Sequence, residues 1–299
     1  MLDLLIIGSG PAGLSAAIYA KRANLELLVL EKVYCGTGQI AESSQVDNYL
    51  GYCGINGYDL GEKFREHAIS LGVEIMPKEA VGFEVEGKIW KVHCSNGETI
   101  EAKTVIYATG AAHRHLGVPG EEEYAGKGVS YCATCDGAFF RNKDTAVIGG
   151  GNTAMDDALY LSELCNKVYL IHRRNEFRGS KKTLERIRQK ENIELVTPAE
   201  IVKIAGEDKV SSVELKDGKI LEVDGVFVAV GMTPQTDSIK EQVELDHAGY
   251  VVADETGKTS AHGFFVAGDV RAKFLRQVIT AASDGANAAI AAVEYLNEE

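Results

Sequence analysis

The sequence is poor in proline, tryptophan and positive charge, and it has no long apolar run. Its 299 residues include five prolines and one tryptophan, and 45% of them are hydrophobic, which favours packed cores over disorder. Lysine and arginine number 31 against 44 acidic residues, and the resulting net charge of −13 argues against nucleic acid as a partner. No segment reaches the roughly 20 apolar residues of a membrane-spanning helix. The length fits two domains.

The N-terminus lacks the basic segment and the cleavage site of a secretory signal, because it enters an apolar strand at Leu2. The sequence therefore predicts a cytoplasmic protein with no affinity for a membrane. Lasting structural disulfides are rare in that compartment. A close pair of cysteines there predicts redox chemistry or metal binding.

One pair of cysteines has the spacing of a reactive motif. The six cysteines are Cys35, Cys53, Cys94, Cys132, Cys135 and Cys165. Cys132 and Cys135 can close a small disulfide ring, and Asp136 follows directly. The pair could instead be half of a zinc site, for which His113 and His115 are the nearby candidates. The four single cysteines are predicted to be buried or half-buried apolar groups.

A glycine-rich stretch, Gly8-Ser9-Gly10-Pro11-Ala12-Gly13, lies between an apolar strand at 4–7 and an alanine-rich helix at 14–22. A second strand, 25–30, ends at Glu31. This context is typical of a dinucleotide-binding turn, whose phosphates face the N-terminus of the helix. The carboxylate of Glu31 can accept hydrogen bonds from a ribose and repels a 2′-phosphate. The first turn is therefore predicted to bind FAD or NAD.

The same plan repeats later in the chain. A strand at 145–148 leads into Gly149-x-Gly151-x-x-Ala154, a helix to about 164 and a strand at 167–171. Asn96-Gly97 and Asp217-Gly218 each predict a hairpin turn within one repeat. The repeat predicts an α/β fold of two Rossmann-like, doubly wound, three-layer dinucleotide-binding domains, each with an inserted hairpin sheet.

The two repeats differ in charge after the second strand. His172-Arg173-Arg174 stands where the first repeat has Glu31, and Arg178 follows. Guanidinium groups suit a 2′-phosphate, so this turn is predicted to bind NADPH. The alternative is a solvated basic helix start. The basic residues predicted to face solvent are Lys181, Lys182, Arg186, Arg188 and Lys190.

Taken together, these motifs resemble those of the low-molecular-weight thioredoxin reductases of bacterial type, over nearly the whole chain. Further matching motifs are Ala108-Thr109-Gly110, Cys132 to Gly137, and Gly268-Asp269-Val270 with Arg276-Gln277. In that family the NADPH-binding domain is inserted into the FAD-binding domain. The resemblance implies an FAD-binding domain at 1–112 and 236–299, an NADPH-binding domain with the cysteines at 113–235, and a homodimer.

The motifs and the resemblance together imply the residues that bind each cofactor, and no metal is expected. FAD contacts are expected at Gly8, Ser9, Gly10, Pro11, Ala12, Gly13, Glu31, Gln39, Asn48, Thr109, Gly110, Gly268, Asp269, Arg276 and Gln277. NADPH contacts are expected at Gly149, Gly151, Asn152, Thr153, His172, Arg173, Arg174 and Arg178.

The implied reaction carries electrons from NADPH through FAD and the cysteine pair to thioredoxin or a thioredoxin-like disulfide protein. By resemblance, Cys135 lies nearer the flavin, Cys132 attacks the substrate and Asp136 acts as acid and base on the thiols. The resemblance also implies that one domain rotates against the other, with hinges near 112–115 and 234–237.

Three alternatives stay open at this point. One is a flavin-dependent NAD(P)H oxidase or peroxide-linked reductase, in which the cysteines are secondary. Another is a non-enzymatic sensor of nucleotides. The last is a paralogue that reduces a different thioredoxin-like protein or uses another electron donor.

Overall fold

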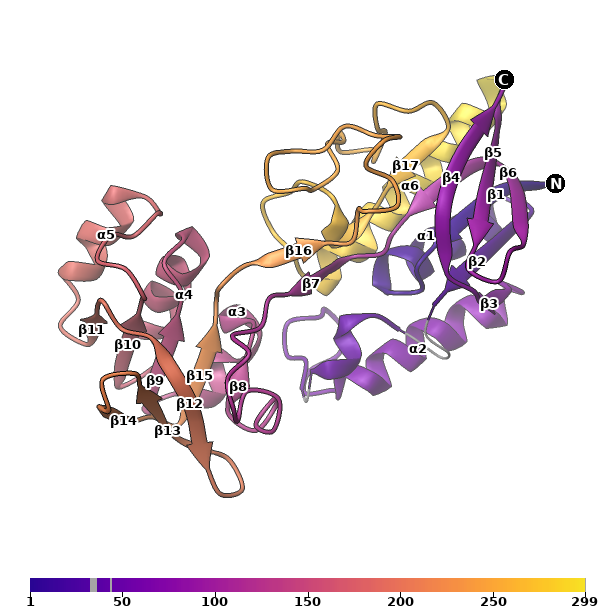
Figure 1. Ribbon diagram of the computed structural model, residues 1–299. Coiled ribbons are helices and arrows are strands. Elements are labelled where there is room, and N and C mark those ends of the chain that lie inside the picture. The colour runs from indigo at the N-terminus through magenta and orange to yellow at the C-terminus, as the bar shows by residue number, and fades with distance from the viewer. Residues whose placement is uncertain (33–36, 44, 299) are drawn as a thin grey trace. The chain divides into compact units, whose positions relative to one another are not determined.

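The computed structural model describes residues 1–32, 37–43 and 45–298, and the chain divides into two compact units. Unit 1 consists of Met1–Ala112 and Thr233–Glu299, and unit 2 consists of His113–Met232 (Figure 1). The second junction thus falls after Met232, whereas the sequence placed it after Gln235. Two short strands carry the chain between the units, and they pair with each other: β7 (Ala111–His113) and β16 (Met232–Pro234).

Unit 1 is built on a seven-stranded sheet in the order β3-β2-β1-β6-β5-β4, with β17 also paired to β6. Its strands are β1 (Leu2–Ile7), β2 (Leu27–Glu31), β3 (Ile75–Pro77), β4 (Ala80–Glu86), β5 (Ile89–Cys94), β6 (Thr99–Tyr107) and β17 (Phe264–Val266). The hairpin β4–β5 does not form a separate sheet, contrary to the prediction. The nine-residue β6 pairs with β5 through its first half and with β1 along most of its length, so it joins the hairpin to the parallel strands.

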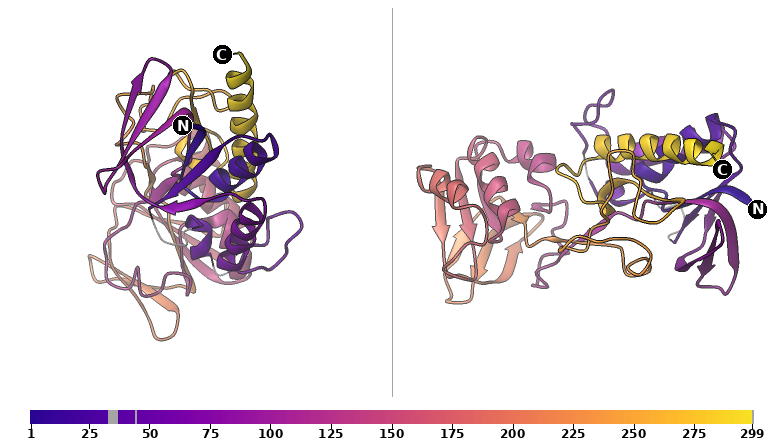
Figure 2. Two further views of the ribbon diagram at one scale, coloured as in Figure 1. Left: turned by 90° about the vertical axis from the view of Figure 1, so that its right-hand side faces the viewer. Right: turned by 90° about the horizontal axis from the view of Figure 1, so that it is seen from above.

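Both faces of this sheet are covered by other parts of the chain. Each strand contributes to both cores, because successive side chains of a strand point to opposite faces. Leu4 and Ile6 of β1 face a core shared with the helices, and Leu5 and Ile7 face a core completed by Val251 and neighbouring side chains of the segment before β17. The helices of unit 1 are α1 (Pro11–Arg22), η1 (Gln39–Glu42), α2 (Gly57–Ser70), η3 (Gly268–Val270) and α6 (Val278–Glu298). Helices α1 and α6 pack side by side on one face of the sheet (Figure 2).

Unit 2 has a parallel sheet in the order β11-β10-β9-β15-β8 and a separate antiparallel sheet β12-β13-β14. Its strands are β8 (Val129–Ser130), β9 (Asp144–Ile148), β10 (Lys167–Ile171), β11 (Ile193–Val196), β12 (Ile201–Gly206), β13 (Val210–Leu215), β14 (Ile220–Glu222) and β15 (Gly225–Val228). Its helices are α3 (Ala133–Asp136), η2 (Gly137–Phe140), α4 (Asn152–Ser162) and α5 (Lys181–Arg188). Val147 faces the core under α4, whereas Ile148 faces the core under the antiparallel sheet, which gives three layers.

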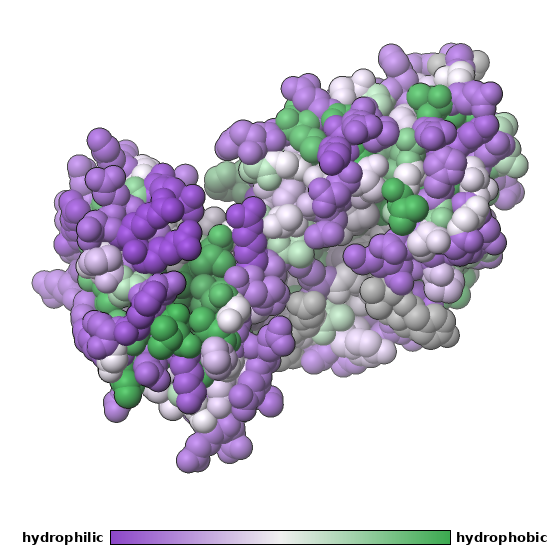
Figure 3. Space-filling view, in the orientation of Figure 1, coloured by the Kyte–Doolittle hydropathy of each residue, from purple (hydrophilic) through white to green (hydrophobic). Residues whose placement is uncertain are grey.

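Hydrophilic side chains cover most of the face of each unit that Figure 3 displays, in keeping with the net charge of −13. In the described part of the chain, no helix combines the length and the apolar character needed to cross a bilayer.

The close approach of α1 and α6 depends on Gly285. A Cβ at this position would lie 2.0 Å from the carbonyl oxygen of Ala12 and 2.9 Å from the amide nitrogen of Ala16, both in the backbone. Gly285→Ala is therefore expected to push the helices apart at a cost of about 1–3 kcal/mol. The temperature of flavin release, followed by flavin fluorescence, should fall by several degrees. Ser283→Ala, at an exposed position of the same helix, is the control, and an equal shift in both variants would contradict this account.

Asp157 of α4 is a half-buried acid whose ionisation should cost stability. Burial, and to a smaller extent the charge of Asp156, raises the pKa of Asp157 to about 7. The unfolded pKa is about 3.9, so the stability contributed by the neutral acid is complete below pH 4 and is lost as the pH rises to 7. Asp157→Asn should therefore raise Tm near pH 8 by several degrees and leave it unchanged near pH 4.

The control is Asp156→Asn, which removes one charge from an exposed position of the same helix. Thermal melts from pH 4 to 8.5 decide the matter. If the gain in Tm for Asp157→Asn does not depend on pH, the raised pKa of Asp157 is contradicted.

Candidate active site

The first glycine turn joins β1 to α1 and is shaped by close backbone contacts. Gly8 has φ +103, and a Cβ there would lie 2.6 Å from the carbonyl oxygen of Ala108. A Cβ at Gly13 would lie 1.9 Å from the carbonyl oxygen of Gly8, so the helix approaches the turn closely, as predicted. At Gly10, the N-cap of α1, the nearest atom to a Cβ would be 3.7 Å away. Pro11 is the first residue of α1. The turn thus presents the backbone N–H groups of the following residues of the first helical turn to an anionic ligand.

Glu31, at the end of β2, lies beside this turn. Its Oε2 accepts hydrogen bonds from the N–H of Ser9 at 2.9 Å and from the Ser9 hydroxyl at 2.8 Å. A carboxylate at this place suits a ribose and repels a 2′-phosphate. The geometry therefore fits the adenosine end of FAD.

Other predicted FAD residues come together from distant parts of unit 1. Asn48 Nδ2 donates to Gln277 Oε1 at 2.9 Å, across 229 positions of sequence. Thr109 Oγ1 donates to the carbonyl of Gln235 at 3.1 Å. Gly110 has φ +72, and its carbonyl accepts the N–H of Gln235 at 3.1 Å. Gln39 begins η1 and is exposed.

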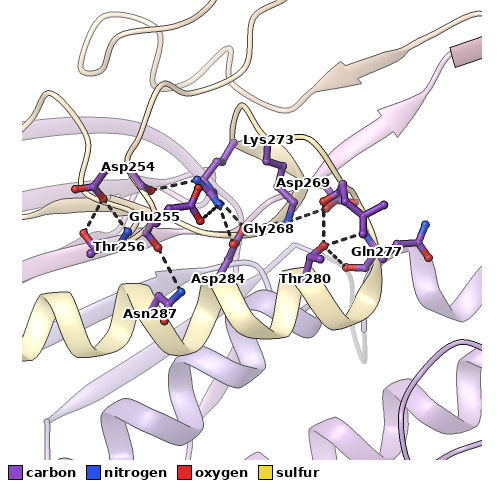
Figure 4. Close-up of polar contacts among 12 residues, drawn as sticks. Asp254, Glu255, Thr256, Gly268, Asp269, Lys273, Gln277, Thr280, Asp284 and Asn287 are labelled. Atoms are coloured by element: carbon purple, nitrogen blue, oxygen red, sulfur yellow. Dashed lines mark hydrogen bonds and ion pairs between the residues drawn. The ribbon is translucent and has the colours of Figure 1, made fainter. Parts of the chain in front are cut away.

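The turn at Gly268 and Asp269 is held by a buried ion-pair network (Figure 4). Asp284 Oδ2 accepts the N–H of Gly268 at 3.1 Å and the ammonium of Lys273 at 2.9 Å. The same carboxylate pairs with the guanidinium of Arg271. Removal of either partner would leave a buried charge unpaired. Asp284 therefore fixes the backbone that carries Asp269.

Buried polar atoms without hydrogen-bond partners point to a polar ligand in unit 1. Among the described residues they include Asp269 Oδ1, Arg276 Nε and Thr37 Oγ1. Lys273 Nζ lies 3.6 Å from Asp269 Oδ1, beyond hydrogen-bonding range. Burial raises the pKa of Asp269, and Lys273 and Arg276 oppose that rise. Because unpaired buried polar groups are costly, these atoms fit a ligand with hydroxyl donors and oxygen acceptors, as FAD has.

Cys132 and Cys135 form a disulfide at the start of α3, with Cα atoms 5.3 Å apart. Both are half-buried. Cys94 and Cys165 are buried as predicted. The prediction for Cys53 was wrong, because it lies exposed in a bend, and Cys35 lies outside the described residues. The described residues contain no group of three or more His, Cys, Asp or Glu side chains arranged to bind a metal.

Asp136 ends the short helix that carries the disulfide. Ser130 Oγ donates to Asp136 Oδ2 at 2.6 Å, and the same Oγ accepts the N–H of Cys132 at 3.1 Å. Burial raises the pKa of Asp136, and the hydrogen bond from Ser130 opposes the rise. A carboxyl group with a raised pKa can hold a proton and give it to a nearby thiolate. The sequence did not single out Ser130, because its role depends on a tertiary hydrogen bond.

The second glycine turn joins β9 to α4 and packs against His172. A Cβ at Gly149 would lie 2.3 Å from the carbonyl oxygen of Ala229. A Cβ at Gly150 would lie 2.2 Å from the imidazole ring of His172. Gly151, the N-cap of α4, has open space around it, and Asn152 and Thr153 form the first turn of the helix. The turn therefore leaves room for a pyrophosphate at Gly151. At position 150 the ring of His172 leaves no room for a side chain.

The predicted arginines lie on an exposed loop after β10. Arg173, Arg174 and Arg178 are exposed, and none of them has an ion-pair partner within the described part of the chain. His172 is buried, and its Nε2 has no hydrogen-bond partner among the described residues. Burial lowers the pKa of His172, and the arginines lower it further. Exposed guanidinium groups outside ion pairs fit a 2′-phosphate, and the charge of Arg173 also acts on Glu200.

Each unit has a glycine turn, the charges beside the two turns are opposite, and a disulfide lies next to an acid. These features define a two-nucleotide redox enzyme of the disulfide-reducing class. The chain belongs to the pyridine nucleotide-disulphide oxidoreductase family, whose model matches residues 2–285.

Relatives within this family are similar over almost the whole chain. The thioredoxin reductase of Mycolicibacterium smegmatis is 46% identical, with 99% of this chain and 97% of the relative covered. That of Treponema pallidum is 45% identical with the same coverage. The crystal structure of thioredoxin reductase from Streptococcus pyogenes has a TM-score of 0.95 at 41% identity, with 100% and 99% covered. The predicted fold class of two Rossmann-like domains is confirmed.

Asp136→Asn tests the proton-transfer role of the acid. The amide cannot exchange a proton with a thiol, so disulfide-reducing turnover with NADPH should fall about 10²-fold or more. Reduction of the flavin by NADPH should be unchanged in stopped-flow traces. Ser130→Ala removes the hydrogen bond that lowers the pKa of Asp136, so the acid should keep its proton to higher pH. The limb of the pH–activity profile that depends on Asp136 should therefore shift to higher pH. Turnover within twofold of the wild type for Asp136→Asn would exclude the role.

Proposed function

We propose that the protein is an NADPH-dependent thioredoxin reductase that acts through FAD and the Cys132–Cys135 pair. The observation that carries the proposal is a disulfide beside the half-buried acid Asp136, in the same unit as an arginine-flanked glycine turn. Four thioredoxin reductases between 40% and 46% identical, over 99% of this chain, support the choice of substrate.

FAD and NADPH are the cofactors of the enzyme. Unit 1 would hold FAD through its glycine turn, Glu31 and the buried acceptor of Asp269. Unit 2 would hold NADPH through Gly151 and the guanidinium groups of Arg173 and Arg174. Within the part of the chain that the structure describes, buried polar atoms of unit 1 lack hydrogen-bond partners and the arginines of unit 2 form no ion pair, which supports this assignment of the two units.

When bound, FAD would supply hydride acceptance from NADPH and delivery of an electron pair to a disulfide. Reduction would open the bond between Cys132 and Cys135, and Asp136 would provide the proton for one of the two sulfurs. The Cys132 thiolate then attacks the disulfide of thioredoxin and expels one of its thiolates, which takes up a proton. Attack by Cys135 on the mixed disulfide releases the second thiol and restores the protein disulfide. In sum, NADPH, a proton and a disulfide yield NADP⁺ and a dithiol.

Of the alternatives, the oxidase is disfavoured, and the paralogue is an outcome of a substrate test. Oxygen as the main acceptor would leave the Cys132–Cys135 disulfide without a role, and the relatives do not favour it. A paralogue would reduce another disulfide protein faster than thioredoxin. A panel of thioredoxin, a glutaredoxin-like protein and a peroxidase, compared by kcat/KM, distinguishes these partners.

Assembly and motion stay predictions that rest on the resemblance, and location stays a prediction that rests on the sequence. We propose a cytoplasmic homodimer, without nucleic acid or membrane as a partner, whose units rotate about the junction of β7 and β16. Light scattering of the holoenzyme measures the assembly. A disulfide or chemical clamp between the units that leaves turnover unchanged would exclude the rotation.

Replacement of both Cys132 and Cys135 by serine separates a reductase from an oxidase. The double variant should keep its flavin and should still consume NADPH slowly with oxygen. Its reduction of thioredoxin should fall to background, because serine forms no disulfide and offers no thiolate. An anaerobic assay of thioredoxin thiols measures this directly.

The control is Cys53→Ser, which removes an exposed thiol from unit 1 and should leave thioredoxin reduction unchanged. Substantial thioredoxin reduction by the double variant would exclude the proposed route for the electrons.

A further inference from the structure

The loop that carries the arginines is attached to the second glycine turn at three points. We call the segment from His172 to Ser180 the basic loop. The ring of His172 lies against Gly150, as the 2.2 Å approach to a Cβ there shows. The N–H of Arg178 donates to the carbonyl of Gly150 at 2.7 Å. The N–H of Ser180 donates to Oδ1 of Asn152 at 2.8 Å.

Only the third attachment depends on an exposed polar side chain. The second is made by backbone atoms, and the first is the packing of a buried ring. Gly179 allows the third, because a Cβ there would lie 2.8 Å from Asn152 Oδ1 and 2.2 Å from the methyl carbon of Met155. Ser180 is also the N-cap of α5. Asn152 therefore ties the end of the basic loop and the start of α5 to the first turn of α4.

This attachment matters for one part of the nucleotide. Arg173, Arg174 and Arg178 are exposed, so they lose side-chain entropy when they grip a phosphate. A loop already held in place lowers that cost, since less of the chain must be ordered on binding. NADPH and NADH share the pyrophosphate that the glycine turn binds, and they differ only in the 2′-phosphate. A change in loop order should therefore affect NADPH alone.

We propose that Asn152 is a residue that positions the basic loop and thereby determines cofactor specificity. Its Oδ1 holds the loop in the geometry that grips the 2′-phosphate, so the choice of NADPH over NADH depends on a contact within the protein. The proposal rests on the assignment of NADPH to unit 2. It adds Asn152, which holds the basic loop in position, to the charged residues assigned to NADPH.

The test compares Asn152→Ala with Asn152→Asp in the FAD-loaded full-length enzyme. The alanine variant loses the acceptor for the N–H of Ser180, and one hydrogen bond is worth about 3- to 10-fold in binding. The ratio of kcat/KM for NADPH to that for NADH should fall by this factor. The Kd of NADP⁺, measured by calorimetry without turnover, should rise equally. The aspartate variant keeps an acceptor at the same place, and its charge acts on the shared pyrophosphate, so its ratio should match the wild type.

Each other outcome overturns the proposal. An unchanged ratio in Asn152→Ala would show that the contact does not order the loop. An equal loss for both nucleotides would show that Asn152 acts on the shared phosphates. A ratio that falls equally in Asn152→Asp would exclude the acceptor as the cause. If the wild type does not prefer NADPH, the proposal fails with the cofactor assignment, whereas a failure to reduce thioredoxin leaves the binding test intact.

Discussion

Side chains of opposite charge lie at matching positions beside the two glycine turns, and the proposed roles of the two units depend on this contrast. In unit 1 the second strand ends at Glu31, whose carboxylate already receives both donors of Ser9. In unit 2 the matching strand leads to His172 and exposed arginines that form no ion pair with any described residue. Carboxylates repel a 2′-phosphate and guanidinium groups bind it in a bidentate manner. The contrast is the basis of the proposal that unit 1 binds FAD and unit 2 binds NADPH.

The disulfide belongs to the same unit as the arginines. Ser130 links the backbone of Cys132 to the carboxyl group of Asp136, so the acid and the sulfurs are held as one group. The orphaned acceptor of Asp269 and the network around Asp284 belong to the other unit. In the proposed function, a nucleotide and a disulfide carried by one unit would serve a flavin carried by the other. This requirement is the physical reason for including rotation in the proposed cycle.

Local features were predictable from the sequence, and tertiary ones were not. Glycine spacing and apolar runs located both turns, and β10 (Lys167–Ile171) has the predicted bounds, because these signals lie within a few residues. The separate hairpin sheet in unit 1 was wrong, because the length of β6 decides which strands share a sheet. Ser130, Asp284 and the attachment of Ser180 to Asn152 carried no local signal. Each acts through a hydrogen bond that exists only after the chain has folded.

The central claim is that the disulfide of Cys132 and Cys135 exchanges electrons with the flavin. An anaerobic titration with dithionite, followed by flavin absorbance, tests it most directly. The wild type should take up two electron pairs, one for the flavin and one for the disulfide, and the variant with serine at both positions should take up one. Equal uptake by the two proteins would contradict the account.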